Sequence, residues 1–162
     1  MRLPRLRRLL LRSGGLPKEA LESLYTAELP SLESLEIWFG DENYGGCGSI
    51  EAAAPFLVKE TWPRLKHLGL CNAMFTNELC EKLSSASILP QLEQLDLSLG
   101  TMDKSGAKAL LREPQRFAHL QRLNLRGNCL APQIGKRLKT LCPDVDVRYQ
   151  GHRNNRYVTV GE

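Results

Sequence analysis

Leucine residues recur along the chain in a fixed pattern of apolar and polar positions. The motif L-x-x-L-x-[LI] occurs in five copies, whose first leucines are separated by 26, 33, 27 and 28 residues. The copies begin at Leu6, Leu32, Leu65, Leu92 and Leu120. Apolar and polar positions alternate at the end of each copy, which is typical of a short strand with one buried side. The pattern therefore predicts a strand in every copy, with its leucines in a shared core.

Between the copies, the apolar spacing changes to that of helices. Helices are predicted over residues 18–27, 50–59, 78–84, 104–111 and 133–140. Pro17 and Pro132 stand where prolines open helices. Thr76 or Asn77 can cap the third helix, and Asp103 can cap the fourth. One strand and one helix per repeat predict an α/β solenoid, a horseshoe with parallel strands on its concave face and helices on its convex face.

The two ends of the chain are expected to differ from the middle. The repeats are predicted to occupy residues 1–144, and residues 145–162 a C-terminal capping strand or hairpin that includes Val145, Val147 and Tyr157. The first strand has no predicted cover for its leucines. We expect weak, salt-promoted self-association through this open edge or early fraying of the first repeat. Alternatively, a partner covers the edge, or the chain is part of a longer array.

Several segments resemble leucine-rich-repeat proteins. The helix opening DKSGAKALL at 103–111 is similar to the ribonuclease-inhibitor-like branch, and Asn128 matches the asparagine that bonds backbone groups in such turns. More narrowly, residues 35–46, 65–73, 95–111, 145–148 and 156–162 resemble a family of uncharacterised bacterial leucine-rich-repeat proteins, of which this chain would match the C-terminal half. The resemblance implies a cytoplasmic protein with a protein-binding role and no known enzymatic activity. It carries over no catalytic residue.

Composition and charge narrow the expected partners. Leucine makes up 30 of the 162 residues, and the net charge is +4. Residues 1–12 carry +5 and residues 148–162 carry +2, so the body from 13 to 147 carries −3. Because nucleic-acid-binding proteins carry basic charge along a continuous face, we expect no nucleic-acid partner. No apolar run approaches the roughly 18 residues that span a bilayer, so we expect no membrane association.

The cysteines and histidines do not suggest a reactive centre. The five cysteines are an odd number with no C-x-x-C spacing, which predicts buried, reduced thiols in a cytoplasmic protein. His67 and Cys71 share a strand phase, but four residues place them about 13 Å apart, too far for one zinc ion. No serine or cysteine pairs with histidine and aspartate by spacing. We therefore expect no metal, no cofactor and no catalytic residue.

Outward positions on the strands are the candidate binding residues. Trp38 is the most informative, because an exposed aromatic residue on a short strand is typical of an interface anchor. Alternatively, Trp38 folds over the following loop and is half-buried. The loop of residues 40–49, GDENYGGCGS, lengthens the second repeat and could extend the binding surface. The candidate partner-binding residues are Glu36, Trp38, Phe39, Tyr44, His67, Asp96, Asn124 and Arg126.

These features predict a protein–protein interaction module and not an enzyme. The partner is expected to bind the concave strand face and the loop of the second repeat. One alternative is a ligand-binding or enzymatic protein centred on the Gly-rich loop 40–49, although this loop has neither a P-loop lysine nor calcium-ligand spacing. A deep pocket with convergent polar groups beside the loop would favour it. Another alternative is a purely structural half of a larger scaffold.

Overall fold

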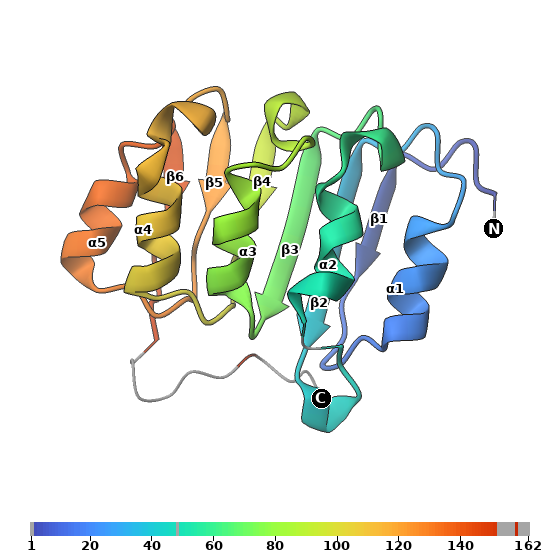
Figure 1. Cartoon of the computed structure of the whole chain (residues 1–162), viewed down its shortest axis with the longest axis horizontal. Helices are drawn as coiled ribbons and strands as arrows, with labels where there is room; N and C mark the ends of the chain where they lie inside the picture. Colours follow the sequence, from blue (N-terminus) through green and yellow to red (C-terminus); the bar gives the residue numbers. More distant parts are fainter. Residues whose placement is uncertain (1, 48, 152–157, 159–162) are drawn as a thin grey trace.

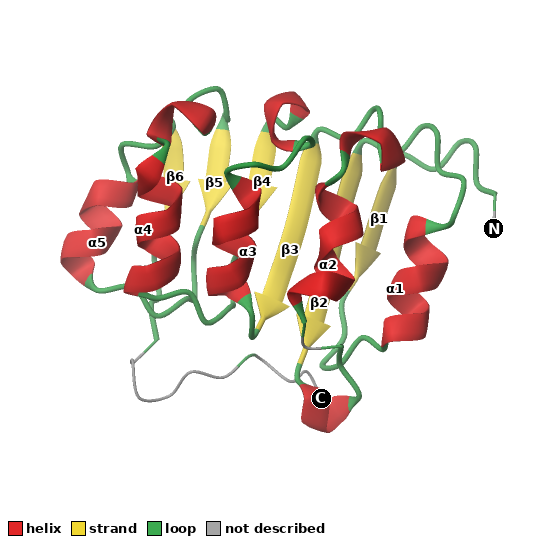
Figure 2. Ribbon diagram, viewed as in Figure 1, coloured by secondary structure: helices red, strands yellow, loops and turns green. Residues whose placement is uncertain are grey.

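The computed structural model describes residues 2–47, 49–151 and 158 of the chain. In these residues, six parallel strands form one sheet in sequence order, and five α-helices cover one of its faces (Figure 1, Figure 2). The strands are β1 (Arg8–Leu11), β2 (Ser34–Gly40), β3 (His67–Ala73), β4 (Gln94–Asp96), β5 (Arg122–Asn124) and β6 (Asp144–Asp146). The helices are α1 (Lys18–Tyr25), α2 (Ile50–Ala53), α3 (Thr76–Leu83), α4 (Lys104–Arg112) and α5 (Pro132–Leu138). The predicted α/β class with parallel strands is confirmed.

The strands lie where the leucine motif predicts them. Each of the first five begins two residues after the first leucine of a copy. Leu35, Leu68 and Leu95 are direct partners across β2, β3 and β4. All three are essentially inaccessible to solvent and belong to the core between the sheet and the helices. In-register pairing therefore stacks the repeated leucines into continuous rows.

The helices agree with the sequence except in the second repeat. The side chain of Asp103 caps α4 as expected, accepting a hydrogen bond from the backbone N–H of Ser105 at 2.8 Å. The predicted helix over 50–59 is wrong. Only α2, a single turn, is α-helical, and a 3-10 turn follows over Ala54–Leu57. Because Pro55 has no backbone N–H to donate, the α-helix does not continue through it.

Neither predicted cap of α3 acts as one. Thr76 is the first helical residue, and its hydroxyl donates to the carbonyl of Ala73 at 2.6 Å. The same hydroxyl accepts from the N–H of Thr101 at 3.2 Å. The side-chain oxygen of Asn77 accepts from the N–H of Asp103 at 3.1 Å. Both side chains therefore connect one repeat to the next.

Aromatic residues also pack within the leucine-rich core. Phe56 stacks on Trp62 with ring centroids 6.2 Å apart, and Phe39 meets Phe75 edge to face at 5.0 Å. All five cysteines lie in the described residues and none forms a disulfide. Four of them are buried, and Cys47 is half-buried. No described helix has the length and apolar character needed to cross a bilayer.

The two edge strands belong to the same parallel array. β6 pairs with β5 in parallel, so it continues the register of the repeats. Of the remaining predicted cap, residues 152–157 and 159–162, including Tyr157 and Val160, lie outside the described residues, whereas Val158 is described and buried. At the other edge, β1 has β2 as its strand neighbour, and Leu6, Leu9 and Leu11 are only half-buried. The first repeat therefore has a less complete core than the middle of the sheet.

Candidate functional site

The face of the sheet away from the helices, here termed the open face, carries three rows of side chains. The first row is Arg8, Ser34, His67, Gln94, Arg122 and Asp144. The second row is Leu10, Glu36, Gly69, Asp96, Asn124 and Asp146. The third row is Arg12, Trp38, Cys71, Ser98, Arg126 and Arg148. Because the strands are in register, each one contributes one position to the first and second rows. In the third row, Trp38 and Cys71 lie in strands, and the other four residues follow the ends of β1, β4, β5 and β6.

At the β1–β2 end, three side chains hold one another in place. One carboxylate oxygen of Glu36 accepts from Arg12 Nε at 2.8 Å and from the indole N–H of Trp38 at 2.9 Å. The Arg12 guanidinium also lies 5.3 Å from the centroid of the Trp38 ring. Burial alone would raise the pKa of Glu36, but the hydrogen bonds from Arg12 and Trp38 outweigh it, and the pKa lies below its usual value. Trp38 is half-buried against these neighbours.

The middle of the open face contains a hollow of about 190 Å³. Its lining residues are His67, Gln94, Leu95, Asp96, Arg122 and Asn124. The two carboxylate oxygens of Asp96 accept from the N–H of Ser98 at 2.8 Å and from the Asn124 amide at 2.7 Å. Burial lowers the pKa of His67, although the nearby carboxylates of Asp96 and Glu36 oppose this shift. His67 is therefore neutral near pH 7.

Folding brings Ser34 and His67 together, which spacing could not predict. Ser34 Oγ lies 3.4 Å from His67 Nδ1. A catalytic triad also needs a carboxylate that orients the histidine. The Asp96 carboxylate instead holds Ser98 and Asn124. Ser34 and His67 therefore make a long polar contact.

At the β5–β6 end, two arginines surround an exposed tyrosine. The Arg148 guanidinium binds both carboxylate oxygens of Asp146, at 2.9 and 2.6 Å. Hydrogen bonds from Arg148 lower the pKa of Asp146 to about 2, even though burial opposes the shift. Tyr149 is 71% exposed, and its ring centroid lies 4.5 Å from the Arg126 guanidinium and 5.9 Å from that of Arg148. Tyr149 has φ +55°, and this turn places its ring beside the two arginines.

The structure does not bring all the predicted partner-binding residues together. Glu36 and Trp38 are in contact, and His67, Asp96 and Asn124 share the central hollow. The expectation for Phe39 is wrong. It continues the inward phase of Leu35 and Ile37 on β2 and is fully buried. Tyr44 is 63% exposed but lies on the loop in a short 3-10 turn, Glu42–Tyr44, separate from the three rows.

The Gly-rich loop closes tightly against the first repeat. The N–H of Asp41 donates to the carbonyl of Gly14 at 2.8 Å, and the N–H of Cys47 donates to that of Leu16 at 2.8 Å. A Cβ atom on Gly40 would overlap the backbone of Gly14. Gly40 therefore permits close backbone contact, which is a structural role.

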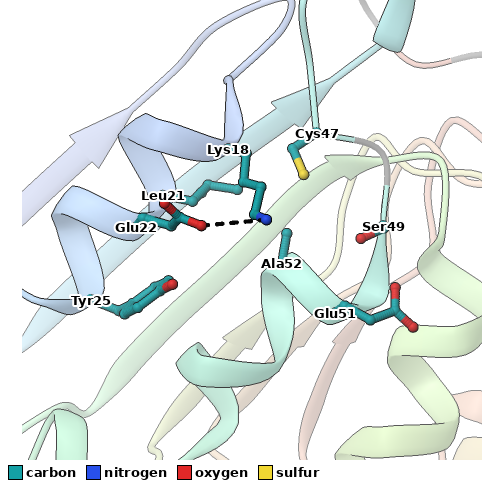
Figure 3. A pocket seen from close by; sticks show the side chains of 8 residues that line it. All are labelled: Lys18, Leu21, Glu22, Tyr25, Cys47, Ser49, Glu51 and Ala52. Atoms are coloured by element: carbon teal, nitrogen blue, oxygen red, sulfur yellow. Dashed lines mark ion pairs between the residues drawn. The ribbon is translucent and has the colours of Figure 1, made fainter.

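A pocket of about 320 Å³ lies between α1 and α2, where the loop ends (Figure 3). Its lining residues are Lys18, Leu21, Glu22, Tyr25, Cys47, Ser49, Glu51 and Ala52. Lys18 and Glu22 form an ion pair of 3.5 Å within it. Among the described residues, no histidine lines the pocket, so none of them gives the Cys47 thiol an imidazole base there. Within the described residues, no group of three or more His, Cys, Asp or Glu side chains could hold a metal ion.

Comparisons with known proteins show the fold. No protein-family model and no curated protein matches the chain. The chain is similar to the crystal structure of an uncharacterised Bacteroides fragilis protein from the Northeast Structural Genomics Consortium, with a TM-score of 0.90 and 32% sequence identity. The match covers 96% of this chain and 45% of that protein. This chain therefore has the fold of a segment that makes up less than half of the Bacteroides protein.

Sequence reasoning missed Tyr149, an exposed aromatic side chain beside the arginines of the open face. Tyr149 falls within the predicted capping segment 145–162 and is not among the candidate binding residues, and β6 ends before it, at Asp146. The available signal was the position of two arginines, because Arg126 and Arg148 occupy equivalent outward positions just after neighbouring strands. Aromatic rings commonly lie against guanidinium groups. The open face consequently has an arginine–aromatic cluster at each end.

Proposed function

We propose that the chain is a leucine-rich-repeat module of the ribonuclease-inhibitor-like type that binds another protein in the cytoplasm. The binding surface would be the open face together with the loop 40–49. Asn128 supports the repeat type. Its buried amide donates to the carbonyls of Leu97 and Leu125, at 2.8 and 3.0 Å, and accepts from the N–H of Met102 at 3.0 Å. A repeat asparagine that bonds the turn backbone makes contacts of this kind.

The observation that carries the binding proposal is the fixed orientation of Trp38. Glu36 and Arg12 hold the indole on the open face from two sides. Tryptophan and arginine contribute strongly to interfaces, and a side chain that is already oriented loses little conformational entropy on binding. The central hollow beside this cluster offers further donors and acceptors from His67, Asp96 and Asn124. We expect these side chains and Tyr44 to contact the partner.

Affinity capture from an extract of the source organism tests the proposal. The bait is the wild-type chain, the Trp38→Ala variant or a matched Val58→Ala variant. Val58 is 42% exposed and follows the 3-10 turn after α2. The Val58→Ala variant therefore removes apolar surface at a position outside the three rows. We expect Trp38→Ala to lose a protein that wild type and Val58→Ala retain. Equal recovery with all three baits would reject the proposal and favour a structural scaffold.

The pocket between α1 and α2 supports a second candidate function, small-molecule binding beside the Gly-rich loop. An Ala52→Phe substitution would fill the pocket without altering the open face. Under this alternative, the small-molecule fraction of the extract raises the unfolding temperature of wild type but not that of Ala52→Phe. An equal response of both proteins would exclude the pocket as the binding site.

A further inference from the structure

Exposed arginines make the surface of the third row basic, although carboxylates lie beside them. Arg12, Arg126 and Arg148 are exposed, and the side chain of Arg148 is 65% accessible. The neighbouring carboxylates of Glu36 and Asp146 retain only 10% and 6% of their side-chain accessibility. The arginines therefore cover the carboxylates, and an approaching molecule meets guanidinium groups first.

These guanidinium groups retain hydrogen-bond donors for a partner. Among the contacts of the described residues, Arg12 uses Nε toward Glu36, and Arg148 uses Nε and Nη2 toward Asp146, so neither guanidinium uses all five of its donors. Arg126 lies against the Tyr149 ring, and no carboxylate pairs with it in the part of the chain that the structure describes. Internal contacts thus orient the arginines before any ligand binds. Such pre-organisation lowers the entropic cost of binding an anion.

The third row has the dimensions of a short extended peptide. Its middle positions are the small residues Cys71 and Ser98, which are buried and touch each other through the thiol and hydroxyl at 3.8 Å. The larger side chains stand at the two ends. Five strand spacings of about 4.8 Å separate Arg12 from Arg148, or about 24 Å. At about 3.3 Å per residue, an extended segment of roughly seven residues would reach from one end to the other.

We propose that the third row binds an extended protein segment rich in aspartate and glutamate. The proposal rests on the proposed protein-binding function and names its partner class. Carboxylates of the segment pair with Arg126 and Arg148 at one end and with Arg12 at the other, and its apolar parts contact Trp38 and Tyr149. A protein segment fits better than nucleic acid. The exposed arginines stand only at the two ends of the row, so they do not form the continuous basic face on which nucleic acid binds.

Fluorescence anisotropy with a rhodamine-labelled octa-glutamate peptide tests this partner class. We expect wild type to bind it and to bind octa-glutamine and octa-lysine much more weakly. Raising the salt from about 0.05 M to about 0.5 M should weaken binding about tenfold or more, since the Debye length falls. The Arg126→Gln/Arg148→Gln variant should lose at least about tenfold in affinity. The matched Arg112→Gln/Arg137→Gln variant removes equal charge from exposed positions on α4 and α5 and should bind like wild type.

Arg126→Gln alone guards against a folding defect, because it leaves the Arg148–Asp146 pair intact. It should also weaken octa-glutamate binding while the unfolding temperature stays unchanged. Equal affinity of the two double variants, or binding of octathymidylate as tight as that of octa-glutamate, would overturn the inference. If octa-glutamate does not bind but Trp38→Ala still loses a captured protein, the acidic partner class is wrong and the proposed protein-binding function stands.

Discussion

The turns that leave the strands are held differently in the two halves of the sheet. Between β1 and β2, backbone contacts backbone. The N–H of Asp41 donates to the carbonyl of Gly14, the N–H of Cys47 donates to that of Leu16, and a Cβ atom on Gly15 or Gly40 would overlap neighbouring backbone. Between β3, β4 and β5, side chains occupy the corresponding space. The N-terminal turns therefore depend on the absence of side chains and the C-terminal turns on their presence.

Two asparagines illustrate the second arrangement. Asn128 bonds three backbone groups from its own and the preceding repeat. Asn77 accepts from the N–H of Asp103 at 3.1 Å and from that of Gly106 at 3.0 Å. At the motif position of Asn128, the earlier copies have glycine or alanine. A Cβ atom on Gly100 would overlap the hydroxyl of Thr76, so that hydroxyl fills the place of a larger side chain. The missing asparagines are thus replaced by other contacts.

The largest effect is expected from a side chain in the N-terminal turn. Gly40 has φ +76°, and a Cβ atom there would meet the backbone of Gly14. Gly40→Ala should lower the free energy of unfolding by about 4 kcal/mol, combining overpacking with left-handed strain. Gly45→Ala is the matched control, because Gly45 has φ +81° but nothing within 4 Å of the added atom. It should cost only about 1 kcal/mol. Similar urea midpoints for the two variants would mean that close backbone contact is unimportant.

In the C-terminal turn, removal of a side chain should be the damaging change. Asn128→Ala leaves two buried carbonyls and one buried N–H without the amide, which should cost about 3 kcal/mol. The control Asn43→Ala removes an exposed amide from the loop and should cost at most about 0.5 kcal/mol. Urea denaturation followed by circular dichroism measures both. If Asn128→Ala unfolds like Asn43→Ala, the two halves do not differ in the way the contacts indicate.

The sequence predicted the fold and the difference between the N-terminal and C-terminal turns only in part. The phase of the leucines placed the strands and the outward rows, because period-two alternation depends on neighbouring residues alone. The prediction for Phe39 did not follow this rule, because the inward phase of β2 places Phe39 in the core. The helix over 50–59 failed because Pro55 interrupts backbone hydrogen bonding. The capping role of Asp103 was predictable, since its partner Ser105 is two residues away.

At the candidate site, side-chain contacts between different repeats were the hardest to predict from the sequence. The Arg12–Glu36–Trp38 cluster joins two strands, and its geometry depends on rotamers that spacing does not specify. Tyr149 reaches Arg126 only because its own backbone turns to φ +55°. Asn77 resembled a helix cap, because the sequence does not show that a neighbouring turn lies within reach. Side-chain hydrogen bonds were thus predictable where the two partners are close in the sequence.

The edge and centre of the sheet should also differ in hydrogen exchange. The amides of residues 9–11 in β1 should exchange at least about tenfold faster than those of 95–97, because local opening exposes less core at the edge. Leu9 and Leu11 are half-buried, whereas Leu95 and Leu97 are buried. Exchange measured on dilute protein avoids the self-association expected at this edge. Equal protection of both segments would show that the first repeat is as stable as the fourth.

The smallest effect concerns the acid dependence of the two ends of the second row. The folded-state pKa of Asp146 is about 2, below the value of about 3.9 for an unfolded aspartate. Its stabilisation is therefore fully present above about pH 4 and is lost as the pH falls toward about 2. Asp146→Asn should lower stability near pH 7 but change it little near pH 2, so the difference from wild type should shrink on acidification. Glu36→Gln is the companion at the N-terminal end, where the pKa is also lowered. Urea midpoints across this range measure both, and a difference between wild type and Asp146→Asn that stays constant with pH would show that the Arg148 pair does not stabilise the last repeat.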